Sequence, residues 1–146
     1  MQLKTFHLAA TQNIPNSRLP LLYYSNAFPD NATASQMETK LRSNGWIPQV
    51  SLYLTSVLMS QWRYSMYRES HYHSTTHESL AVFRGNARLR FGVSNDDNAS
   101  DAIFLTVKVG DVIVIPAGVA HCALDESGGF CMVGSYPDVG PFTSSL

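Results

Sequence analysis

Four potential metal ligands lie within one stretch of eight residues: His71, His73, His77 and Glu78. Imidazole nitrogens and carboxylate oxygens are ligands that first-row divalent metals favour in proteins. An extended strand sends residues i and i+2 to the same face, so His71 and His73 can reach one ion together. The stretch therefore predicts part of a metal site, whose remaining ligand must come from elsewhere in the chain.

Simple alternation from His73 would place His77 on the same face and Glu78 on the opposite face. If Glu78 is a ligand, a bulge or turn within residues 74–77 must shift the register. His77 is then expected beside the ligands or as a proton carrier in the pocket, with a purely structural role as an equal alternative.

Most of the chain after residue 78 has the pattern of short strands separated by Gly and Pro turns. We expect a hairpin at 80–91 that turns at Gly85 and Asn86, followed by strands at 103–109, 112–115 and 130–136. Residues 87, 89 and 91 should face inward. Residues 19–24 indicate an edge strand or an extended arm. This pattern is typical of a β-sandwich or a small barrel.

One short helix is expected at about 34–44, because Thr33 and Gln36 form a capping-box pattern and Asn44-Gly45 is a stop signal. Its charged residues are expected to face solvent: Glu38, Lys40 and Arg42. The window 50–59 is nearly uncharged and alternates poorly, which is compatible with a buried strand, a short helix or an insertion. The Arg and Tyr side chains of residues 63–68, Tyr67 among them, are candidates for the pocket rim.

The composition excludes some classes of partner. A length of 146 residues suits one domain, and a formal charge of -1 provides no basic field for nucleic acid or anionic lipid. No segment has the length and apolarity of a signal peptide or a membrane span, so a cytoplasmic location is expected. Cys122 and Cys131 are expected to be buried thiols.

Two motifs in this order resemble those of the cupin superfamily. The first is His71-x-His73, then four intervening residues and Glu78, then six intervening residues and Gly85, although Ser65 stands where the pattern has a glycine. The second is a glycine, five residues, Pro-x-Gly, two residues and a histidine. It is complete here: Gly110, Pro116, Gly118 and His121.

Within this superfamily the chain most resembles the small single-domain YjlB-like cupins. An apolar stretch at 47–61 is an insertion relative to the pattern of that group. The resemblance implies an all-β double-stranded β-helix, a jelly-roll barrel, with one short N-terminal helix. The expected layout is a single domain over 1–146, with an N-terminal arm and helix at about 1–46 and the barrel at about 47–137.

The resemblance also implies a ligand set formed by His71, His73, Glu78 and His121. Such a set leaves coordination positions open, which is typical of a working site rather than a structural one. His77 and Tyr67 are the candidate catalytic residues. Iron(II) or manganese(II) is the preferred ion, with nickel, copper or zinc as alternatives. The expected partners are a small-molecule substrate and a second copy of the chain.

Three functions fit these residues. The first is a dioxygenase-type oxidoreductase that acts on a small organic metabolite. The second is a redox-neutral isomerase or decarboxylase in which the metal acts as a Lewis acid. The third is a cupin that binds a metal or a metabolite without catalysis.

Overall fold

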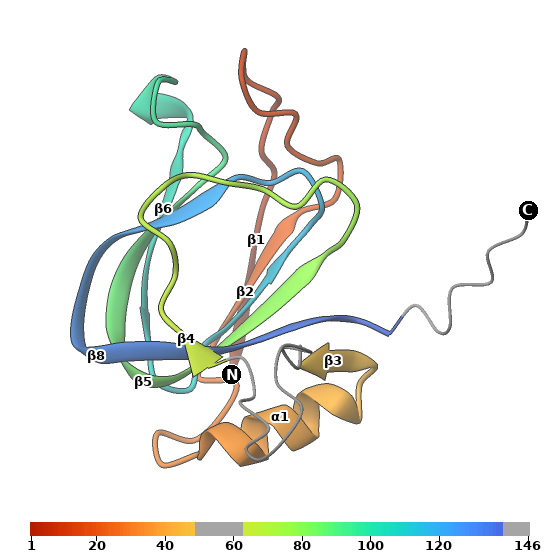
Figure 1. Cartoon of the computed structure of the whole chain (residues 1–146), viewed down its shortest axis with the longest axis vertical. Helices are drawn as coiled ribbons and strands as arrows, with labels where there is room; N and C mark the ends of the chain where they lie inside the picture. Colours follow the sequence, from red (N-terminus) through yellow and green to blue (C-terminus); the bar gives the residue numbers. More distant parts are fainter. Residues whose placement is uncertain (49–62, 139–146) are drawn as a thin grey trace, which may run out of the picture.

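A computed structural model describes residues 1–48 and 63–138, and in these ranges eight strands form one antiparallel sheet that curls into a barrel (Figure 1). The strand order is β1-β2-β7-β5-β8-β3, while β4 pairs with β8 and β6 pairs with β5. The strands are β1 (Gln2–Phe6), β2 (Leu21–Ser25), β3 (Trp46–Pro48), β4 (Arg63–Tyr64), β5 (Glu78–Phe91), β6 (Ile103–Lys108), β7 (Val112–Ile115) and β8 (His121–Pro137). The helices are α1 (Ala34–Arg42) and the 3-10 turn η1 (Ala99–Asp101). The all-β jelly-roll prediction is confirmed.

The predicted hairpin at Gly85 is wrong, because β5 runs through this glycine as one continuous strand of 14 residues. The predicted strand 130–136 is likewise only the end of β8, which begins at His121. Gly85, Gly128 and Gly129 all have positive φ, and Asn86 lies opposite Ser127 in the β5–β8 pair. These glycines therefore bend a two-stranded ribbon where the sequence suggested chain reversals.

The bend positions the functional site. A straight strand of 14 residues would span roughly 45 Å. In β5, however, Phe91 at one end pairs with His121, and the carboxylate of Glu78 at the other end lies 3.3 Å from the same histidine. The curled ribbon thus brings both ends of β5 to the first residue of β8.

The barrel interior is filled by alternating residues of the long strands. Ala87, Leu89 and Phe91 are buried, as predicted, and pack against Val107 and Ile113 of the neighbouring strands. The strands expected at 103–109 and 112–115 are present as β6 and β7. Cys122 and Cys131 are buried free thiols, as expected.

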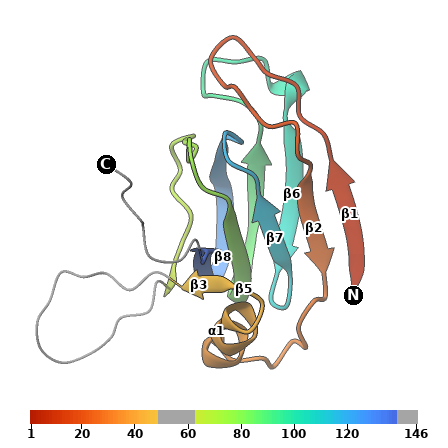
Figure 2. The same ribbon diagram turned by 90° about the vertical axis from the view of Figure 1, so that its right-hand side faces the viewer.

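The N-terminal residues belong to the sheet. Strand β2 pairs with β7 on one side and with β1 on the other, so β1 occupies the edge position predicted for residues 19–24 (Figure 2). Tyr23 of β2 is buried and donates a hydrogen bond of 2.8 Å to Asp111 in the β6–β7 turn. The N-terminal segment is therefore held in the sheet by side chains as well as by the backbone.

Helix α1 begins and ends within two residues of the predicted bounds, and the Thr33–Gln36 capping box is present. The expectation that Glu38 faces solvent is wrong: its side chain is 4% exposed and lies 3.0 Å from Nε of Arg63. Arg63 also donates to Ser35, so β4 is attached to the helix at two points. The window 50–59 lies outside the described residues. In the described ranges no helix is long and apolar enough to cross a membrane.

Candidate metal centre

Two of the predicted ligands are connected through their backbones. His71 lies between β4 and β5 and forms an isolated antiparallel bridge with His121, the first residue of β8. The amide of His121 donates to the carbonyl of His71 at 2.9 Å, and the reverse bond measures 3.3 Å. Peptide hydrogen bonds therefore set the spacing of the two residues before either side chain contributes.

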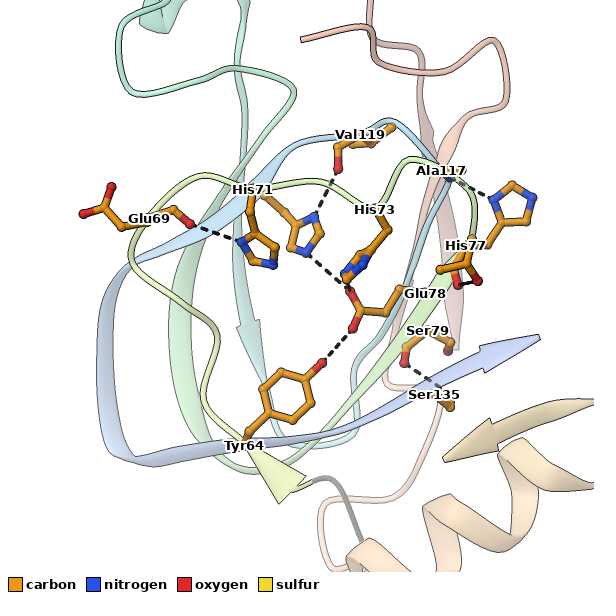
Figure 3. Close-up of polar contacts among 12 residues, drawn as sticks. Tyr64, Glu69, His71, His73, His77, Glu78, Ser79, Ala117, Val119 and Ser135 are labelled. Carbon is orange, nitrogen blue, oxygen red and sulfur yellow. Dashed lines mark hydrogen bonds and ion pairs between the residues drawn. The ribbon is translucent and has the colours of Figure 1, made fainter. Parts of the chain in front are cut away.

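Three imidazoles converge on one point, as Figure 3 shows. The potential ligand atoms of His71, His73 and His121 all lie within 4.8 Å of one another. His121 is buried, whereas His71 and His73 are partly exposed. The cluster thus has a closed side formed by β8 and an open side toward solvent.

Glu78, the first residue of β5, adds a carboxylate to this cluster. It is 3% exposed, and its Oε2 atom lies 3.3 Å from Nε2 of both His73 and His121. Residues 72–77 are outside the strands and contain bends at 74 and 75, so the register break required for Glu78 to face His73 is present.

The geometry of this donor set fits a divalent metal ion. Two ligands bonded to one ion at about 2.1 Å are separated by roughly 3.0 to 3.4 Å for bond angles between octahedral and tetrahedral. The two oxygen-to-nitrogen distances of 3.3 Å fall in this range. The set has imidazole nitrogen and carboxylate oxygen without thiolate, which suits iron, manganese, nickel, copper and zinc alike.

Hydrogen bonds on the outer ring nitrogens orient two of the imidazoles. Nδ1 of His121 lies 3.1 Å from the carbonyl of Val119, and Nδ1 of His71 lies 3.2 Å from the carbonyl of Glu69. A carbonyl can only accept, so each Nδ1 must carry the proton in these bonds. In the neutral rings that a metal requires, each Nε2 then has a lone pair for the ion.

The Pro116–Gly118 turn holds the histidine segment against the barrel. The amide of Gly118 donates to the carbonyl of His73 at 2.8 Å, and the amide of Ala117 donates to Nδ1 of His77 at 2.9 Å. His77 is absent from the cavity lining, and Figure 3 shows its ring away from the three converging imidazoles. The role of His77 as a proton carrier stays a prediction. Its hydrogen bond with Ala117 helps to hold the loop against the Pro116–Gly118 turn.

The environment of the cluster shifts the pKa values of three of these ligands. Burial lowers the pKa of His71, with a further contribution from His121. Burial alone would raise the pKa of Glu78, but hydrogen bonding with His121 and His73 outweighs it and lowers that pKa well below its usual range. The hydrogen bond with Glu78 raises the pKa of His73. Metal binding requires neutral imidazoles and an ionised carboxylate, so the raised pKa of His73 makes its proton the main competitor with a metal as the pH falls.

The cavity beside the cluster is small, with a volume of about 30 Å³. It has room for one or two water-sized species, but it does not enclose a metabolite. Its lining is formed by these residues: Tyr64, Met66, Tyr67, His71, His73, Glu78, Leu80, His121 and Tyr136. Tyr67 is 65% exposed and its ring centroid lies 5.3 Å from that of His71, which puts it at the mouth.

Sequence reasoning included Tyr64 only among the Arg and Tyr candidates for the pocket rim, and it did not single out Tyr136. The hydroxyl of Tyr64 donates a hydrogen bond of 2.7 Å to Oε1 of Glu78. Burial, followed by the charge of Glu78, raises the pKa of both tyrosines, so both remain protonated at neutral pH. The available signal was the alternation of Tyr64 and Met66 ahead of the histidines, which is also the pattern of an ordinary strand. Arg63, a candidate for the pocket rim, turns instead to Glu38 of α1.

Comparison with known proteins gives three similarities. The family model described as Cupin matches residues 46–133. The "Uncharacterized protein YjlB" of Bacillus subtilis (strain 168) is 33% identical over 135 residues, which cover 92% of this chain and 69% of that protein. The structure of RmlC from Streptococcus suis in complex with dTDP-D-xylose aligns over 97% of this chain and 73% of its own, at 14% identity and a TM-score of 0.44.

Proposed function

The chain belongs to the cupin family, among its small YjlB-like members, and from that premise we propose that it is a metal-dependent dioxygenase acting on a small organic metabolite. The observation that carries the proposal is the convergence of His71, His73 and His121 within 4.8 Å, beside the carboxylate of Glu78. A group of four protein ligands leaves positions free on a five- or six-coordinate ion.

The proposed ligands are His71, His73, Glu78 and His121, and the proposed ion is iron(II) or manganese(II). When bound, such an ion supplies the redox chemistry that incorporation of both atoms of dioxygen into an organic substrate requires. The buried side of the cluster, formed by β8, excludes water, while the partly exposed His71 and His73 leave an approach for substrate.

Tyr67 is the proposed proton carrier, because its ring lies against that of His71 at the cavity mouth, where a substrate held outside the small cavity would sit. His77 is the second proposed catalytic residue. Its Nδ1 accepts the hydrogen bond from the Ala117 amide, so its ring would act from the side of the His73 loop that faces away from the cluster. The homodimer stays a prediction. Strand β1 pairs only with β2 among the described residues, so one sheet edge is available to a second copy.

The first test is metal content. His73→Ala and His121→Ala should each lose most of the metal that the wild type retains, measured by elemental analysis of protein purified in parallel. His7→Ala is the matched control, because His7 is exposed and is not one of the three clustered histidines. Unchanged stoichiometric metal in both ligand variants would contradict the site.

The second test is oxygen dependence. The iron-loaded wild type is offered a panel of small enolic and chelating metabolites with and without dioxygen, and oxygen uptake is recorded together with product. Oxygen uptake equal to product formed supports a dioxygenase. Equal turnover without oxygen would identify a redox-neutral isomerase or decarboxylase instead, and binding without turnover under any metal would identify a binding protein.

A further inference from the structure

We propose that Tyr64 is a positioning residue for the metal-binding carboxylate, because it holds Oε1 of Glu78 so that Oε2 alone faces the imidazoles. This inference rests on the metal site proposed above. In Figure 3 the phenol of Tyr64 and the histidines lie on opposite sides of the Glu78 carboxylate. The two oxygens of one carboxylate therefore have different partners.

The distances show this division. Oε1 of Glu78 accepts the hydrogen bond from the Tyr64 hydroxyl at 2.7 Å, whereas Oε2 lies 3.3 Å from Nε2 of both His73 and His121. A phenol hydroxyl has one proton to donate, and a bond of this length to an ionised acceptor is among the stronger kinds of hydrogen bond. A swing of Oε1 toward the imidazoles would break it.

The fold confines the Tyr64 ring to this position. Strand β4 pairs with β8 so that Tyr64 is opposite Met132, and the ring lies against the backbone of Gly134. A Cβ atom on Gly134 would lie 2.5 Å from the Tyr64 hydroxyl oxygen and 2.6 Å from Cε1. Glycine is therefore required at 134 to admit the ring, even though its own φ is not in the left-handed region.

The neighbouring residue restrains β4 from the other side. Arg63 is bonded to Glu38 and Ser35 of α1, so a strand of only two residues is fixed to both the helix and β8. Tyr64 thus reaches Glu78 from a well-supported backbone. A hydrogen bond from such a donor can determine which carboxylate oxygen faces the metal.

The consequence concerns the number of free coordination positions. If Glu78 binds through Oε2 alone, three imidazoles and one oxygen leave two positions on a six-coordinate ion. If both oxygens bind, a single position remains, which is too few for a chelating substrate. Tyr64 would therefore preserve the position that substrate needs, although it touches neither metal nor substrate.

The experiment uses the full chain, with cobalt(II) as a probe ion that reports both affinity and coordination number through its visible spectrum. Tyr64→Phe retains the ring and removes the hydroxyl. It should weaken cobalt(II) binding by about 10- to 100-fold, as is typical when the hydrogen-bond partner of a metal ligand is lost. It should also lower the molar absorbance of the cobalt bands, because a second carboxylate oxygen raises the coordination number.

Two further variants isolate the hydroxyl. Tyr24→Phe is the matched control: it removes a phenol hydroxyl in the cluster packed around α1, and both affinity and spectrum should match the wild type. Gly134→Ala should displace the Tyr64 ring and reproduce the loss. Added to Tyr64→Phe, it should weaken cobalt(II) binding little further, since the hydrogen bond is already absent.

The outcomes separate this inference from the proposed function. If the wild type binds cobalt(II) stoichiometrically and Tyr64→Phe has the same affinity and spectrum, the positioning role is wrong and the metal site stands. If the wild type binds no cobalt(II), both are wrong. A thermal unfolding midpoint of metal-free Tyr64→Phe close to that of the wild type, together with a changed spectrum, would support positioning over a general loss of stability.

Discussion

The ion pair between Arg63 and Glu38 should be a main support of the barrel wall next to the site. The Glu38 side chain is 4% exposed and that of Arg63 is 39% exposed, with Nε and Oε1 3.0 Å apart and a second contact of 3.4 Å. Arg63→Met keeps the aliphatic stem but leaves the buried carboxylate without this partner. The variant therefore tests whether the helix depends on a charge carried by β4.

The expected loss follows from the burial of the two groups. Removing one partner of a fully buried pair costs about 3–5 kcal/mol, because the remaining charge is uncompensated. Solvent reaches Arg63 and screens part of this interaction, so we expect about 2–3 kcal/mol here. Glu38→Leu combined with Arg63→Met removes both charges and should cost less than Arg63→Met alone.

The assay is urea denaturation of the metal-free protein at neutral pH, followed by far-ultraviolet circular dichroism. Arg42→Met is the control, because Arg42 is an exposed residue in the last turn of the same helix and should change stability by no more than about 0.5 kcal/mol. An Arg63→Met loss no larger than that of the control would refute the reasoning. So would a double variant whose loss equals the sum of the two single losses.

Two further predictions concern the bends and the loops. Gly85→Ala should lower the free energy of unfolding by more than about 2 kcal/mol, since φ is +68° and the new Cβ would lie 2.7 Å from the Phe130 amide nitrogen. Gly45→Ala, at φ +77° with no atom within 4 Å, should cost only about 1 kcal/mol in the same urea titration. Hydrogen bonding from the Ser94 amide lowers the pKa of Asp97. The stabilisation of the folded state by the ionised Asp97 carboxylate is therefore complete above the unfolded-state pKa of Asp97, and it is lost as pH falls through the folded-state pKa. The melting temperatures of Asp97→Asn and the wild type should accordingly converge below about pH 4. A constant gap across that range would contradict this role for Asp97.

The sequence predicted well which residues converge at the metal centre. It predicted less well the path that the chain follows between them. Alternation over 87–91 identified the buried face of β5, and the capping box located α1. Gly85 was misinterpreted because a positive φ serves both a reversal and a bend. The choice depends on whether Ser127 and Phe130 of a distant strand lie against it.

The contacts of Glu38 and Tyr64 that the sequence did not predict have a common cause. Glu38 lies on a helix whose pattern of charges is compatible with solvent exposure, and only the position of Arg63 explains its burial. Tyr64 is one of several aromatic residues before the histidines, and its contact with Glu78 depends on the missing side chain at Gly134. Local patterns show what a residue can do, whereas these contacts arise between segments that are distant in sequence.

The backbone bridge between His71 and His121 has a consequence for the kinetics of metal exchange. Two reciprocal peptide hydrogen bonds join these residues, so the backbone conformational entropy of the pair is lost during folding rather than during metal capture. Capture should therefore need little rearrangement of this pair, and its rate should follow dehydration of the ion. A bound ion stabilises the state in which the bridge is closed, so these two amides should exchange hydrogen more slowly when the site is filled.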